Sequence, residues 1–161
     1  MIINSSAGWG TIIVSLFVAF VLAIVPLPEW LIHWRPAWVA LVVIYWVIAQ
    51  PHRFGVIAAW LTGLMLDVLV NNTLGQNAVA LAVIAYTSYV LHMRIRVFPL
   101  WQQCLSILVL VGIYQLVSIL VMRAVQITPW TFWYWVSVVA SAIVWPLVSL
   151  ALGYLRGQRG G

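Results

Sequence analysis

Long apolar runs, separated by short breaks of polar residues, glycine and proline, follow one another along the whole chain. The runs are about 15 to 25 residues long, and they lack the alternation of apolar and polar positions that marks the strands of a membrane barrel. An α-helix rises about 1.5 Å per residue, so about 20 such residues cross a hydrocarbon core of about 30 Å. The pattern therefore predicts transmembrane helices.

The breaks divide the chain into six predicted transmembrane helices, which we expect to form one compact bundle and a single domain over residues 1–161. The predicted spans cover residues 9–25, 36–50, 54–70, 77–91, 100–121 and 130–154. We expect the polar stretch that begins at His92 to end the fourth helix, and Pro146 to kink the last one. The second helix, about 22 Å long, is short for a span. Either its ends are buried in the bundle, or the bilayer thins locally, or residues 29–35 complete the crossing.

Composition supports an integral membrane protein, because 66% of the 161 residues are hydrophobic and only 6% are charged. The net charge of +5 would suggest a nucleic-acid partner in a soluble protein. Here every basic residue is an arginine near a helix end, so membrane orientation and lipid headgroups explain the charge better. We expect lipid contacts and no nucleic-acid partner.

The arginines also predict the orientation of the chain in the membrane. With six spans both termini lie on one side, where the scheme also places the arginines Arg53, Arg94, Arg96, Arg156 and Arg159. Only Arg35 and Arg123 fall on the other side. Because positive charge collects on the cytoplasmic side, both termini are predicted to be cytoplasmic.

Four residues spaced by four, Gly55, Ala59, Gly63 and Asp67, form one stripe on the third predicted helix. Small side chains let another helix backbone approach closely and gain dispersion contacts along its length. The stripe has two interpretations, packing inside this bundle and contact with another chain, of which internal packing is favoured.

Asp67 is one of only two acidic residues, and an ionisable group in an apolar span needs a partner, a wet cavity or a proton. A functional interpretation makes it a proton or cation relay, so ion conduction is one alternative. A structural interpretation makes it a buried anchor for an arginine, and Arg35 and Arg123 are placed at the same depth. A relay usually needs further ionisable groups across the membrane, and none continues inward from Asp67, so the anchor is favoured.

The sequence offers no arrangement that suggests catalysis. Acid-base and nucleophilic catalysis need a base beside a nucleophile, or two carboxylates at one site, and neither pattern occurs. His33, His52 and His92 are scattered without metal-ligand spacing. Phosphate-binding loops and dinucleotide fingerprints are lacking as well. We therefore expect no enzymatic activity, no metal and no cofactor.

Several short motifs, in order and at characteristic spacing, resemble the MreD family of rod shape-determining proteins. They are Arg35-Pro36-Ala37-Trp38, Tyr45-Trp46, Pro51-His52-Arg53 with Gly55, Gly63-Leu64 with Asp67, and Leu74-Gly75. Trp101-Gln102-Gln103 is similar to the Gram-negative form. The resemblance implies a fold similar to the membrane substrate-binding subunits of energy-coupling-factor vitamin transporters, and no enzymatic activity.

The resemblance further implies work in the elongation machinery that builds side-wall peptidoglycan, together with MreC, the actin-like MreB, the glycosyltransferase RodA and its partner transpeptidase. The candidate structural or partner-interface residues are Arg35, Pro36, His52, Arg53, Gly55, Ala59, Gly63, Asp67, Gly75 and Arg123. We therefore expect a non-catalytic scaffold in the bacterial inner membrane that binds MreC, helps couple MreB filaments to peptidoglycan synthesis and maintains rod shape.

A small-molecule-binding membrane subunit of the vitamin-transporter type is the alternative function. It needs several polar groups that converge on one pocket. The sequence supplies few beyond Asn77, Gln102, Gln103 and Gln115. Whether two copies of the chain pair is left open.

Overall fold

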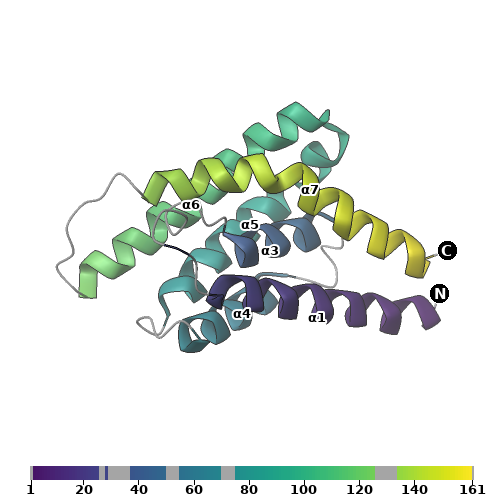
Figure 1. The fold of residues 1–161 in the computed structure, drawn as a ribbon, viewed down its shortest axis with the longest axis horizontal. Helices are drawn as coiled ribbons and strands as arrows, with labels where there is room; N and C mark the ends of the chain where they lie inside the picture. The colour runs from purple at the N-terminus through teal and green to yellow at the C-terminus, as the bar shows by residue number, and fades with distance from the viewer. Residues whose placement is uncertain are drawn as a thin grey trace.

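A computed structural model of the chain describes residues 2–25, 28, 37–49, 55–69, 75–125 and 134–160. The described part is helical throughout its regular segments, as predicted (Figure 1). Its helices are α1 (Ile2–Ile24), α3 (Trp38–Ala49), α4 (Val56–Leu69), α5 (Gln76–Val97), α6 (Leu100–Val125) and α7 (Tyr134–Gly160).

Three of these helices contain segments long and apolar enough to cross a membrane, namely Gln76–Ile95 in α5, Leu100–Ala124 in α6 and Trp135–Gly153 in α7. The remaining three contain shorter apolar segments, Gly10–Ile24, Trp38–Ala49 and Val56–Leu69. The boundaries of the predicted spans lie within a few residues of most observed helix ends, because proline and glycine mark those ends in the sequence.

The short helix α3 lies at the centre of the bundle, where it contacts α1, α5, α6 and α7 (Figure 1). All ten of its residues from Val39 to Ile48 are buried. A helix that is apolar all round is stable only when it is surrounded, and these neighbours surround it.

The other helices pack around α3 in an arrangement that brings the two ends of the chain together. Helix α4 packs mainly on α5, which also contacts α3 and α6, and α7 packs on α6, α1 and α3. Figure 1 shows that α1 begins and α7 ends at the same end of the bundle. We call this end the terminal end.

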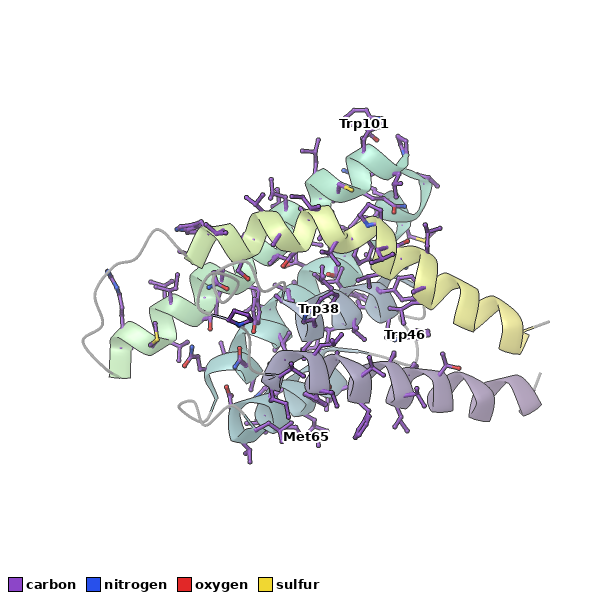
Figure 2. All side chains as sticks on the ribbon, in the orientation of Figure 1. Trp38, Trp46, Met65 and Trp101 are labelled. Atoms are coloured by element: carbon purple, nitrogen blue, oxygen red, sulfur yellow. The ribbon has the colours of Figure 1, made fainter. Side chains whose placement is uncertain are left out.

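The exterior of the bundle is apolar. Met65 and Trp101 point outward in Figure 2 and are 59% and 64% exposed, whereas Trp46, on α3, is fully buried. Many more large apolar side chains are exposed on the outer faces of α1, α4, α5, α6 and α7. A soluble monomer rarely exposes contiguous apolar surface on this scale, so this exterior suits lipid chains.

A few hydrogen bonds between helices satisfy polar groups inside this apolar bundle. Trp46 Nε1 of α3 donates to Ser15 Oγ of α1 at 2.8 Å. The backbone N–H of Ala37, just before α3, donates to Ser141 Oγ of α7, also at 2.8 Å. Such bonds fix the register of helices whose apolar surfaces alone specify it weakly.

Three helix ends differ from the prediction by more than a few residues, and the first is the start of α1, which lies at Ile2 and not at Trp9. Helix α5 does not end at Leu91 but continues to Val97, because Arg94 is exposed while Ile95, the next residue, is only 2% exposed. An apolar face therefore continues past the polar residues. The helix ends at Phe98, which is extended, as expected for the residue before Pro99.

Helix α7 continues past the predicted end at Tyr154 to Gly160, with Pro146 inside it. Its axis changes direction along its length (Figure 1). A proline inside a helix removes one backbone hydrogen bond and crowds the preceding turn, which accounts for such a bend without ending the helix.

Candidate functional site

The carboxylate of Asp67 is the centre of a buried polar junction between α4 and α5. Asp67 lies in the last turn of α4 and is 0% exposed. The backbone N–H of Gly75 donates to its Oδ2 at 2.9 Å, and that of Asn77 donates to Oδ1 at 3.0 Å. The N–H of Ala78 reaches Oδ2 at 3.4 Å, and the side-chain amide of Asn77 donates to Oδ1 at 2.9 Å.

These donors are the free N–H groups at the start of α5, so Asp67 caps a helix other than its own. The N-cap position of α5 is Gly75, which has no side chain to satisfy them. A carboxylate supplied from α4 takes over the role that Asp, Asn or Ser normally plays at this position. Negative charge is also favoured at a helix N-terminus by the helix dipole.

This geometry changes the interpretation of Asp67. The sequence predicted an anchor with an arginine as its partner, and the structure shows a carboxylate that accepts hydrogen bonds from backbone N–H groups and an amide of α5. An arginine partner stays a prediction. Arg123 lies exposed in the last turn of α6, and Arg35 lies outside the described residues. The prediction missed these donors because a helix N-terminus that begins with glycine has no side-chain signature of an anion site.

The junction also includes α6. Tyr114 of α6 donates its hydroxyl to Asn77 Oδ1, so both ends of the Asn77 amide are hydrogen-bonded. One turn further along α6, Ser118 Oγ accepts a hydrogen bond from Gln76 Nε2 at 3.0 Å. Tyr114 and Ser118 are not among the site residues predicted from the sequence. The sequence did carry one signal for them, because Tyr114 and Ser118 are spaced by four and so share a face of a span that also contains Gln115.

The small-residue stripe is used mainly inside the bundle. A Cβ atom added to Gly63 would clash with the backbone of α5, lying 2.6 Å from Ala78 N and 2.7 Å from the carbonyl carbon of Asn77, and Ala78 Cα is nearer still. Ala59, one turn earlier, is 0% exposed. Gly55 differs, because a Cβ there would meet nothing within 4 Å. The structure therefore agrees with internal packing at Ala59, Gly63 and Asp67, and leaves Gly55 open.

Gly75 occupies a backbone conformation that favours glycine, with φ of +100°. Replacing it with alanine places a Cβ in the left-handed region, so we expect Gly75→Ala to lower the free energy of unfolding by about 1–2 kcal/mol. Gly75→Asn should cost less, since asparagine tolerates this region better. Denaturant unfolding in detergent micelles measures both. An alanine variant as stable as the unmodified protein would contradict this account of the turn.

Four candidate residues, Arg35, Pro36, His52 and Arg53, lie outside the described residues. Within the described ranges, no three side chains of His, Cys, Asp or Glu come together in a way that could hold a metal ion.

Taken together, the apolar exterior, the membrane-length helices and the buried polar junction define a multi-pass membrane protein. The family model for the rod shape-determining protein MreD matches residues 5–155. The chain is also 32% identical over 151 residues to the rod shape-determining protein MreD of Haemophilus influenzae, covering 92% of this chain and 91% of that protein. No solved structure matches the chain.

The chain therefore belongs to the MreD family of rod shape-determining proteins, which confirms the resemblance seen in its sequence motifs. This is a family of shape-determining proteins and not a known enzyme family.

Proposed function

We propose that the protein is a non-catalytic scaffold of the cell-elongation complex in the bacterial inner membrane, which binds the single membrane helix of MreC. In this role it helps couple MreB filaments on the inner side to peptidoglycan synthesis by RodA and its partner transpeptidase. The observation that carries the proposal is the family match over residues 5–155, because membership of this family supports a role in cell shape.

We further propose six membrane crossings with both termini in the cytoplasm. The shared position of the start of α1 and the end of α7 in Figure 1 suits an even number of crossings. Five of the seven arginines fall on the side of the termini in this scheme. Similarity to the substrate-binding subunits of energy-coupling-factor transporters stays a prediction, since no solved structure matches.

The hydrogen bonds of the junction suggest how a partner helix would bind. The polar groups of Asp67, Asn77 and Tyr114 are engaged within the bundle, so a partner helix has to pack on the apolar outer faces. Gly55 is the position in the stripe that leaves room for a close approach. We therefore place the MreC helix at the Gly55 end of α4.

Copurification from native membranes tests the scaffold and this placement separately. Tagged protein should recover MreC, together with RodA and its transpeptidase. Gly55→Leu should lower the recovery of MreC several-fold by filling the proposed contact, whereas Ala124→Leu, which introduces the same side chain at an exposed position on α6, should not. Recovery of none of these proteins would overturn the scaffold, and unchanged recovery with Gly55→Leu would overturn only the placement.

The alternative of a vitamin-type binding subunit now has fewer polar groups available than the sequence suggested, because the amide of Asn77 is engaged in the junction. A thermal-shift screen with vitamins and cell-wall lipid precursors separates it from the scaffold. Ion conduction through Asp67 makes a different prediction, namely that Asp67→Asn abolishes a flux of protons or cations across the membrane of vesicles that contain the protein.

A further inference from the structure

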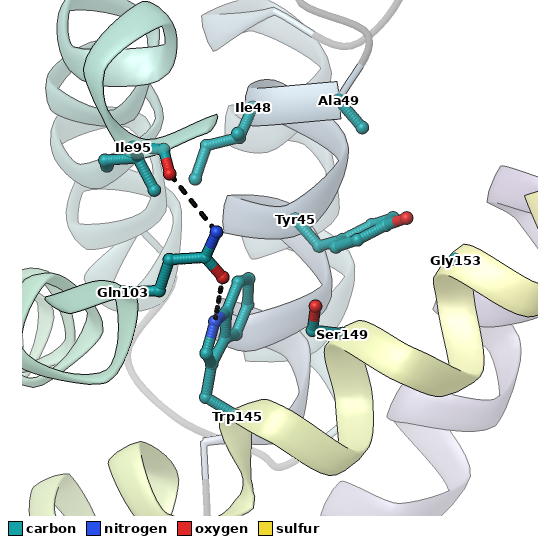
Figure 3. A pocket seen from close by; sticks show the side chains of 8 residues that line it. All are labelled: Tyr45, Ile48, Ala49, Ile95, Gln103, Trp145, Ser149 and Gly153. Carbon is teal, nitrogen blue, oxygen red and sulfur yellow. Dashed lines mark hydrogen bonds between the residues drawn. The ribbon is translucent and has the colours of Figure 1, made fainter. Parts of the chain in front are cut away.

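Helix α6 contains a long apolar segment with a polar residue near each end. The segment Leu100–Ala124 has 25 residues, the most of the three in the described part of the chain that could cross a membrane. Near its start, the amide of Gln103 donates to the Ile95 carbonyl at 3.2 Å and accepts from Trp145 Nε1 at 3.4 Å (Figure 3). Near its end lies the exposed Arg123. From Gln103 to Arg123 the helix is about 30 Å long, which matches a typical hydrocarbon core.

The hydrogen bonds of the buried polar junction show which parts of three helices lie at the same level. Tyr114 and Ser118 of α6 bond to Asn77 and Gln76, so this part of α6 is level with the first turn of α5. Asp67, in the last turn of α4, accepts hydrogen bonds from the start of α5 as well. One layer of the bundle, the junction layer, therefore contains the end of α4, the start of α5 and the turn of α6 from Tyr114 to Ser118.

Helix α6 continues past the junction layer, whereas α4 ends and α5 begins there. From Ser118 to Arg123 it advances about 7 Å further, and in Figure 1 its end projects beyond the other helices on the left, opposite the terminal end. Leu120, in the projecting part, is 57% exposed. At this end of the bundle, the apolar surface therefore reaches about 7 Å further on the α6 side than on the α4–α5 side.

The composition of the connection between α4 and α5 does not suit a place in hydrocarbon. Residues 70–74 join the two helices, and they include the polar run Asn71-Asn72-Thr73. Lipid chains offer no hydrogen bonds to such side chains, so a connection of this composition belongs at the surface of the hydrocarbon core. A flat bilayer that covers α6 as far as Arg123 would place the junction layer, from which this connection starts, about 7 Å below that surface.

Helix α4 cannot remove this difference by itself. A membrane accommodates a short helix by thinning, by charged side chains that reach the headgroups, or by association with another helix. Asp67 is the one ionisable residue within Val56–Leu69, and it is buried, so it does not reach the headgroups. Gly63 lies against the backbone of Ala78, which together with the bonds to Asp67 prevents α4 from sliding along α5. Of the responses that lipid alone allows, thinning remains.

We propose that the protein thins the bilayer on one side, so that the membrane surface opposite the terminal end lies about 7 Å lower beside α4 and α5 than beside α6. Lipid of this thin region covers the outer face of α4. Val68 of α4 and Leu116 of α6 report on the two sides, because both lie in the junction layer and are 69% and 44% exposed. The proposal rests on the six crossings proposed above and not on the binding of MreC.

Site-directed spin labelling of the full chain in dioleoylphosphatidylcholine vesicles tests the proposal. Cys104→Ala removes the native cysteine, and Val68→Cys or Leu116→Cys then places one label in the junction layer on either side. A water-soluble relaxation agent should reach the label at Val68 several-fold more than the label at Leu116, whereas oxygen, which dissolves in lipid, should reach both. Equal access of the water-soluble agent would overturn the proposal. Shielding of the Val68 label from both agents would assign this face to another helix and would overturn it too.

Two controls identify the cause of a difference between the labels. In dimyristoleoylphosphatidylcholine, whose shorter chains make the whole bilayer thin, the agent should reach Leu116 as well and the difference should shrink. An unchanged difference would indicate a water-filled crevice in the protein and would overturn the proposal. The agent should reach Val68 from the membrane side opposite the termini. Access only from the side of the termini would overturn the six crossings together with the thinning, whereas equal access of both labels from the opposite side would overturn the thinning alone.

Discussion

Gly63→Ala is expected to destabilise the bundle by about 3 kcal/mol, because the added methyl group has no space between α4 and α5. The atoms that it would meet belong to the backbone of Asn77 and Ala78, and these cannot move away as a flexible side chain could. Separation of the two helices would also pull Asp67 away from the N–H groups that it caps. Chemical unfolding of the purified protein in mixed micelles measures the loss.

Gly55→Ala is the matched control for this prediction, since it makes the same change in the same stripe. A Cβ at Gly55 meets nothing within 4 Å, so the variant should unfold within about 0.5 kcal/mol of the unmodified protein. Equal stability of the Gly63 and Gly55 variants would show that α4 and α5 do not pack as described.

Asp67→Ala is expected to lower the free energy of unfolding by about 2–4 kcal/mol, because it leaves several buried N–H groups at the start of α5 without an acceptor. Hydrogen bonds in a membrane bundle are individually modest, but here three backbone donors and one amide share a single carboxylate. Asp67→Asn keeps one acceptor oxygen, so it should lower the free energy of unfolding by about half as much. The same unfolding assay, with hydrogen exchange at the first turn of α5, measures both effects.

Val68→Ala controls for the loss of side-chain volume next to Asp67. Val68 is 69% exposed on the outer face of α4, so its truncation should change the free energy of unfolding by less than about 0.5 kcal/mol. If Asp67→Ala were no more harmful than this control, the carboxylate would not be holding the two helices together.

The sequence predicted the helices well because their determinants are local. Apolar runs and proline breaks placed most helix ends within a few residues, and the unbroken apolar surface of α3 agrees with its burial. The end of α5 was wrong for a physical reason. Polar residues from His92 onward suggested a break, but the buried side of the helix continues to Ile95, while Arg94 beside it is exposed.

The candidate site was less predictable, because it depends on contacts between distant residues. Gly55 and Gly63 are equivalent by spacing, yet only Gly63 lies against the backbone of α5. The role of Asp67 depends on where the turn at Gly75 places the start of the next helix. Spacing of four defines a face of a helix, but it does not say which neighbour that face meets.

Substitutions at the two ends of α4 test different properties of the protein. The buried side of α4 stabilises the bundle through Gly63 and Asp67, so substitutions there report on folding. A Cβ at Gly55 meets nothing within 4 Å, so a substitution there tests the proposed partner contact with little effect on folding. Experiments on cell shape that change Gly63 alone would therefore not distinguish loss of a partner from loss of the protein.

The central claim is that this member of the MreD family works by holding the membrane helix of MreC. The most direct measurement is binding between the purified chain in lipid nanodiscs and purified MreC, with and without its membrane helix. The account predicts a stable complex with full-length MreC and about tenfold or greater loss of affinity when the helix is removed. Equal binding with and without the helix, or no binding to full-length MreC, would contradict it.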